Sequence, residues 1–197
     1  IIHPLQPMEK PRPLRTTGFY HRQQELGGYF LEASGFERPQ WYEANKDLVA
    51  KYPTPARDEW SARYWSPIIG AEAQYVRENV GLFDITALKR IEVTGKGSME
   101  FLMEQTTGKL DKAPGSVTYC LMLTKDAGIL SDVTVTRLAE THFMIGANSA
   151  IDVARLKSAA PDTVHIKDVT SGTVGLGLFG PHARKVVEKL TNVDVSN

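Results

Sequence analysis

The sequence predicts an α+β fold, in which a mixed or antiparallel sheet is flanked by helices. Segments with strand-like alternation and segments with helical periodicity follow one another irregularly along the 197 residues. One pair of strand-like segments is joined by a short turn, as in a β-hairpin: Val117 to Leu123, the turn Thr124-Lys125-Asp126-Ala127-Gly128, and Ile129 to Leu138. Irregular succession with hairpins among the strands is typical of α+β proteins.

The first part of the chain, residues 1–57, is predicted to be an irregular linker or central segment. Four prolines within residues 1–18 indicate an extended start. Residues 20–30 have the pattern of a short helix that ends at paired glycines. The aromatic-rich segment 36–42 is predicted to be irregular, either as a packing plug that docks the linker onto a neighbouring domain or as one wall of a ligand tunnel. A break at residues 51–55, which contain two prolines, places the boundary.

Residues 58–197 are predicted to form the first part of a second domain. Gly70 to Val80 has the spacing of an amphipathic helix, and Gly81 follows it as a cap. The other expected elements are a strand-like turn at 82–86, a strand at 88–93, a helix at 98–105 with Ser98 as its N-cap, the hairpin, a strand at 143–147, a helix at 150–159, strands at 163–169 and 173–178, and a helix at 181–190.

The stretch Gly175-Leu176-Gly177-Leu178-Phe179-Gly180 matches the spacing of a dinucleotide-binding loop. Such a loop needs a strand before its first glycine and an acidic residue about 20 positions further on. Here the apolar residues alternate through the glycines, so the strand itself is expected to run across them. We therefore predict a strand with close backbone packing at this position, and no nucleotide site.

Composition limits the classes of function. The 23 Lys and Arg residues balance the 23 Asp and Glu residues, so no basic field attracts nucleic acid or an anionic membrane surface. The single cysteine, Cys120, excludes an internal disulfide and fits a reducing compartment. We therefore expect a cytoplasmic protein, with the mitochondrial matrix as the alternative. The five histidines are scattered, and no metal site is predicted.

Three polar residues lie on or after the strands around the predicted hairpin. Tyr119 is on its first strand, Asp132 on its second, and Asn148 follows the next strand. If these strands are neighbours, a phenol, a carboxylate and an amide converge, and such a set suits a heterocycle that bears N–H and C=O groups. Each residue also has an ordinary interpretation: Asp132 as a solvated edge-strand residue, Tyr119 as a strand aromatic, and Asn148 as a helix N-cap.

Several short motifs, in their order and spacing, resemble the folate-binding aminomethyltransferase fold of the glycine cleavage T-protein. Two upstream segments look like the linker region of dimethylglycine and sarcosine dehydrogenases or oxidases, in which an FAD amine-oxidising domain comes first. The T-protein-like motifs are Leu82-Phe83-Asp84-Ile85, Ile91-Glu92-Val93-Thr94-Gly95, Gly128-Ile129-Leu130-Ser131-Asp132 and Leu178-Phe179-Gly180-Pro181, and the linker-like segments are residues 12–16 and 35–42.

This resemblance implies roles for the three polar residues. Asp132 is the catalytic acid group that faces the N5 and N10 side of tetrahydrofolate, and Tyr119 and Asn148 line the folate site. The chain departs from the usual pattern where Ala127 replaces a glycine and Ser131 replaces a first acidic residue. The Ser-Asp version looks like the dimethylglycine oxidase branch, as does Phe179 at a position where the T-protein often has Gln.

The resemblance also implies a function. The chain captures the iminium or formaldehyde from oxidative demethylation of an N-methyl amino acid, dimethylglycine or sarcosine, as 5,10-methylenetetrahydrofolate. FAD belongs to a domain before Ile1, the rest of the folate domain follows Asn197, and an oligomer is compatible with this arrangement. The alternatives are a glycine-cleavage-type aminomethyltransferase, a non-catalytic regulatory or assembly module, and a folate-dependent O- or S-demethylase, against which the linker-like segment argues.

Overall fold

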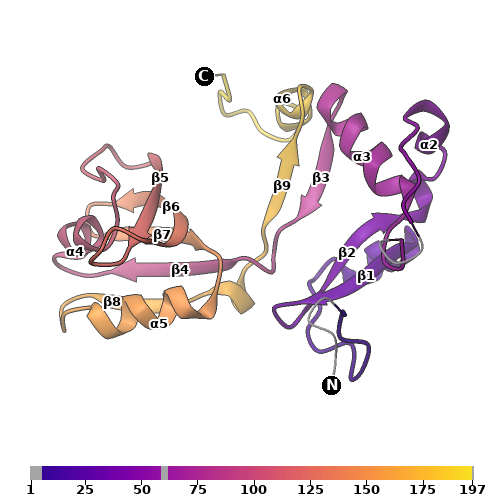
Figure 1. The fold of residues 1–197 in the computed structure, drawn as a ribbon. Helices are drawn as coiled ribbons and strands as arrows, with labels where there is room; N and C mark the ends of the chain where they lie inside the picture. Colours follow the sequence, from indigo (N-terminus) through magenta and orange to yellow (C-terminus); the bar gives the residue numbers. More distant parts are fainter. Residues whose placement is uncertain (1–5, 59–61, 197) are drawn as a thin grey trace. The chain divides into compact units, whose positions relative to one another are not determined.

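The computed structural model describes residues 6–58 and 62–196, so the first five residues of the expected extended start lie outside the described residues. The chain divides into two compact units, one made of residues 1–85 with 176–197 and the other of residues 86–175. Helices and antiparallel sheets alternate irregularly, which confirms the α+β class (Figure 1). The units are defined by packing, and the division near residue 57 into linker and domain stays a prediction.

The unit 86–175 is built on one five-stranded antiparallel sheet. The hairpin β5–β6 lies at one edge, and β4, although first in sequence, lies between β7 and β8. The strand order is β5 (Val117–Leu123), β6 (Ile129–Ala139), β7 (His142–Ala147), β4 (Lys89–Thr94) and β8 (His165–Asp168), and the helices are α4 (Ser98–Gln105) and α5 (Ala150–Ala159).

One face of this sheet forms the core of the unit. Phe143 and Ile145 of β7 are almost completely buried, together with Leu102 of α4 and Leu156 of α5. Successive strand residues point to opposite faces. The helices therefore cover the face that carries these residues, and the alternate residues of β5, β6 and β7 lie on the other face.

The starts of the two helices differ from simple expectations. Ser98 is not an N-cap: it is the first residue of α4, and Gly97 with a φ of 85° occupies the cap position. Ser98 is fully buried, and its hydroxyl has no hydrogen-bond partner among the described residues. At α5 the N-cap is Ser149, so Asn148 is not the N-cap either.

The other unit contains shorter elements. The segment 36–42, expected to be irregular, is instead a strand that pairs antiparallel with β1. Tyr29 and Trp41 stack across this pair with ring centroids 4.0 Å apart. The elements are α1 (Tyr20–Glu25), β1 (Gly28–Ala33), β2 (Phe36–Tyr42), the 3-10 turn η1 (Glu43–Asn45), α2 (Leu48–Lys51), α3 (Pro67–Glu78), β3 (Gly81–Asp84), β9 (Leu176–Phe179) and α6 (Ala183–Val187).

Helix α3 begins earlier than the periodicity predicted. Ser66 is its N-cap and accepts a hydrogen bond from the backbone N–H of Ile68 at 3.3 Å, and Pro67 takes the first helical position. The helix ends at Glu78, and Gly81 belongs to the following strand rather than to the cap.

The glycine-rich stretch at 175–180 is a strand, as predicted. Residues Leu176 to Phe179 form β9, which pairs antiparallel with β3. Gly180 follows with a φ of 115°, and a Cβ at this position would lie 2.4 Å from the carbonyl oxygen of Asn79. The glycine therefore permits a close backbone approach and does not form a phosphate-binding turn. No helix in the described part of the chain is long and apolar enough to cross a membrane.

The core of the sheet unit is tested by two substitutions on one helix. Leu156→Ala removes a side chain that is 1% exposed and is expected to lower the free energy of unfolding by about 2–5 kcal/mol. Ile151→Ala removes an aliphatic side chain of the same size that is 61% exposed, and is expected to change that free energy by less than about 0.5 kcal/mol. Urea unfolding measures both, and equal effects would contradict the assigned core.

Candidate functional site

Asp132 owes its position to the alternation of strand β6. Ser131, Val133 and Val135 are buried against the helices, whereas Asp132 and Thr134 are exposed. Strand β6 is bonded on one side to β5 and on the other to β7, so Asp132 is not an edge-strand residue. It is an exposed carboxylate on the face of the sheet opposite the helices, and its residue pairs with Leu121 of β5.

The structure brings all three predicted site residues together on this face. The Tyr119 hydroxyl donates to Oδ2 of Asp132 at 3.2 Å. The side-chain amide of Asn148 donates to Oδ1 of Asp132 at 2.9 Å and to the Asp132 carbonyl oxygen at 3.0 Å. An ionised carboxylate offers about four lone-pair positions. Each oxygen of this exposed group therefore keeps room to accept a further hydrogen bond or a proton.

Asn148 is held by a residue that the sequence reasoning missed. The carboxylate of Asp152, which is only 2% exposed, accepts hydrogen bonds from the backbone N–H of Asn148 at 3.2 Å and of Ser149 at 2.9 Å. Ser149 and Asp152 form a capping box at the start of α5. The pattern Ser-x-x-Asp at 149–152 is the signal that could have identified this support. It ties the site amide to the first turn of the helix.

The hairpin turn fixes the approach of β6. Ala127 has a φ of 62°, in the left-handed region that favours glycine. Thr124 closes the turn from both sides: its backbone N–H donates to the Gly128 carbonyl at 2.8 Å, and its hydroxyl accepts from the Gly128 N–H at 2.9 Å. These bonds hold Ala127 in a backbone conformation that favours glycine.

The phenol and the carboxylate are electrostatically coupled. The hydrogen bond to Asp132, together with the nearby negative charge of that carboxylate, raises the pKa of Tyr119. The phenol therefore stays protonated and acts as a donor at neutral pH. Within the described ranges 6–58 and 62–196, no three His, Cys, Asp or Glu side chains are grouped so that they could hold a metal ion. The donors and acceptors of this site are a phenol, an amide and a carboxylate.

Comparison with known proteins assigns the family. Residues 19–197 match the family of the GCVT N-terminal domain. The chain belongs to this folate-dependent T-protein family, which confirms the resemblance drawn from the sequence motifs. A solved structure, the glycine cleavage system aminomethyltransferase T from Bartonella henselae, superimposes with a TM-score of 0.70 at 27% identity, over 90% of this chain and 44% of that one.

Two curated relatives represent two activities. A 4-methylaminobutanoate oxidase (formaldehyde-forming) of Paenarthrobacter nicotinovorans is 30% identical over 96% of this chain and 23% of its own length. An aminomethyltransferase of Geobacillus thermodenitrificans is 36% identical over 65% of this chain and 36% of its own length. The chain thus spans less than half of each relative.

The coupling between Tyr119 and Asp132 is testable without any ligand. In Asp132→Asn, we expect the pKa of Tyr119 to fall toward the ordinary phenol value of about 10, because a charged acceptor becomes neutral. Ring ¹³C shifts of tyrosine-labelled protein, titrated with base, measure this pKa, and the spectrum of Tyr119→Phe assigns the signal.

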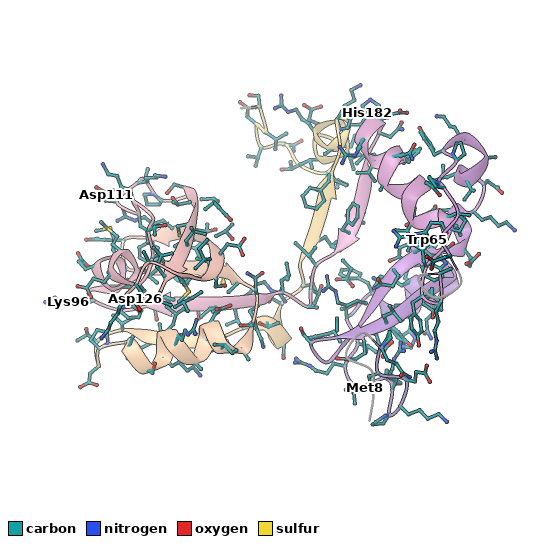
Figure 2. All side chains as sticks on the ribbon, in the orientation of Figure 1. Met8, Trp65, Lys96, Asp111, Asp126 and His182 are labelled. Carbon is teal, nitrogen blue, oxygen red and sulfur yellow. The ribbon has the colours of Figure 1, made fainter. Side chains whose placement is uncertain are left out.

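The matched control is Asp126→Asn. Asp126 is an exposed carboxylate in the turn of the same hairpin (Figure 2), and its replacement is expected to leave the titration of Tyr119 unchanged. A Tyr119 titration that is the same in Asp132→Asn and in the parent chain would show that the hydrogen bond is absent in solution.

Proposed function

We propose that this chain is the tetrahydrofolate-binding part of an enzyme that captures a one-carbon unit released by oxidative demethylation of an N-methyl amino acid. The product is 5,10-methylenetetrahydrofolate. The observation that carries the proposal is the convergence of Tyr119, Asp132 and Asn148 on the uncovered sheet face of a T-protein family member. The similarity to a formaldehyde-forming oxidase over nearly the whole chain supports the source of the carbon.

The chemistry of the site residues fits tetrahydrofolate. When bound, tetrahydrofolate supplies the nucleophilic nitrogens N5 and N10 that take the one-carbon unit. Asp132 accepts an N–H hydrogen bond at its open lone pairs, orients the amine and takes or relays the proton that the amine loses. Tyr119 and Asn148 hold the carboxylate through one donor on each oxygen, so that its position is set before the ligand arrives.

The proposal extends to the organisation of the parent polypeptide. We propose that residues 1–57 form a linker after an FAD-containing amine-oxidising domain, and that residues 58–197 form the first part of the folate domain. The chain covers 23% of the length of the oxidase relative. A parent polypeptide of similar length therefore has room for both the FAD domain and the rest of the folate domain. Dimethylglycine and sarcosine are the proposed N-methyl substrates.

A second function has its own support. The solved relative is a glycine cleavage aminomethyltransferase, and a curated aminomethyltransferase is 36% identical over 132 residues. In that function the one-carbon unit comes from an aminomethyl donor instead of an oxidised methylamine. The source of the carbon therefore separates the two functions, because only the first consumes an N-methyl amine.

The catalytic role of Asp132 is tested in the complete polypeptide. We expect Asp132→Asn to lower the rate of 5,10-methylenetetrahydrofolate formation by roughly 10²–10⁴-fold, because the proton acceptor is lost. Amine oxidation, which is measured by the reduction of FAD, is expected to be unchanged. Asn keeps the size of the side chain and one acceptor oxygen, but its amide nitrogen then faces the donor of either Tyr119 or Asn148. Circular dichroism of the variant therefore checks that the fold is kept.

Two results would contradict the proposal. Methylenetetrahydrofolate formation at the parent rate in Asp132→Asn would remove the role of the carboxylate. A complete polypeptide that does not bind tetrahydrofolate in a calorimetric titration would favour a regulatory or assembly module. Asp126→Asn is the control for both measurements, since Asp126 lies in the turn and is expected to leave binding and rate unaltered.

A further inference from the structure

The unit of residues 1–85 and 176–197 contains a cavity of about 530 Å³ that the proposed folate chemistry does not use. Its wall comes from the end of β2, from η1, from the face of α3 and from β3. The residues that give it chemical character are Tyr42, Asn45, Glu72, Tyr75, Phe83 and Asp84. Carboxylates, an amide and three aromatic rings therefore line one space.

Glu72 is the central polar group of this cavity. Its Oε1 accepts hydrogen bonds from the side-chain amide of Asn45 at 2.7 Å and from the backbone N–H of Tyr42 at 3.2 Å. Its Oε2 has no partner among the described residues. The side chain is half-buried, and this burial raises the pKa of Glu72. A desolvated carboxylate with one open oxygen is stabilised by a cation that brings its own N–H donor.

Aromatic residues line the cavity beside the carboxylates. Tyr42 has a pKa raised to about 12 by burial, with the charges of Asp84 and Glu72 adding to the effect. The phenol is therefore neutral, and both carboxylates act at this ring. Tyr75 and Phe83 also line this cavity. Aromatic faces attract cations, and cages of such rings recognise alkylammonium groups.

A smaller cavity of about 290 Å³ shares Tyr42, Asn45 and Asp84 with the larger one. Gln23 lines it, is only 5% exposed and donates its Nε2 to Asp84 at 2.9 Å. The Gln23 Oε1 is buried and accepts no hydrogen bond from the described residues. A buried acceptor without a partner costs free energy. Gln23 lines the smaller cavity and is not among the residues that line the larger one.

Two arginines line the cavities, and in the described part of the chain neither forms an ion pair with Glu72. Arg38 lines the larger cavity, where it is exposed, and forms no hydrogen bond or ion pair with Glu72. Arg22 lines the smaller cavity and is paired with Glu25 at 2.8 Å. Asp84 already accepts the Thr17 hydroxyl at 2.5 Å. The open carboxylate oxygen that faces a cation is therefore that of Glu72.

We propose that this cavity binds a small organic cation, a protonated alkylamine. Its N–H group bonds to Oε2 of Glu72, and its alkyl groups lie against the rings of Tyr42, Tyr75 and Phe83. The site is built from residues of one packing unit, whereas Tyr119, Asp132 and Asn148 belong to the other. It thus stands independently of the proposed folate chemistry.

Three probes of similar size test the proposal by NMR titration of the chain. Trimethylammonium carries a charge and an N–H, tetramethylammonium carries a charge only, and tert-butanol carries no charge. We expect saturable shifts of the Tyr42 and Tyr75 ring signals with trimethylammonium, at least fivefold weaker binding of tetramethylammonium, and no saturation with tert-butanol. Equal responses to all three probes, or no saturation with trimethylammonium at about 100 mM, would overturn the proposal.

Two variants localise the site. Glu72→Gln keeps an oxygen for the bonds from Asn45 and Tyr42 but removes the charge, and is expected to weaken trimethylammonium binding at least tenfold. Phe83→Leu keeps an apolar side chain, removes one ring and is expected to weaken binding about threefold. Glu188→Gln, in the same packing unit but outside the cavity wall, is the control, because Glu188 is exposed. Circular dichroism confirms that each variant is folded, and parent-like binding by folded Glu72→Gln would refute the assigned site.

Discussion

The alternation of buried and exposed residues along β6 is the constraint on which the site depends. Ser131, Val133 and Val135 are committed to the core, and this commitment sends Asp132 to the opposite face. A slip of one residue in register would bury the carboxylate and expose two valines. The hydrophobic core therefore determines where the charge stands, and the cost of exposing the valines protects the position of Asp132 more strongly than its own hydrogen bonds do.

The partners of Asp132 are placed by different local rules. Tyr119 comes from β5, the neighbouring strand of the hairpin. The pairing of Leu121 with Asp132 sets the distance between the Tyr119 hydroxyl and the Asp132 carboxylate. Asn148 comes from the junction of β7 and α5, where the carboxylate of Asp152 binds its backbone N–H. Sheet register thus positions one hydrogen-bond donor of Asp132, and helix capping positions the other. A change in the capping of α5 displaces Asn148, whereas a change in the register of β6 displaces Asp132 from both donors.

Much of this arrangement follows from local patterns. The helix at 150–159 and the strand at 117–123 have the predicted bounds, because periodicity and hairpin signals lie close together in sequence. The strand at 36–42 was missed because Pro39 and two charged residues hide its alternation, and its stability comes from pairing with β1. The insertion of β4 between β7 and β8 depends on contacts distant in sequence. The contact between Glu72 and Asn45 also joins residues that are distant in sequence, so no sequence motif predicts their cavity.

The two carboxylates illustrate opposite electrostatic designs. Asp132 is exposed and receives one neutral donor on each oxygen, so water and its partners together stabilise its charge. Glu72 is half-buried and receives both of its donors on a single oxygen, which leaves the charge incompletely compensated. An exposed carboxylate that two donors hold in place is accessible to the N–H group of a ligand. A desolvated one suits binding, because an entering cation supplies the compensation that the chain withholds.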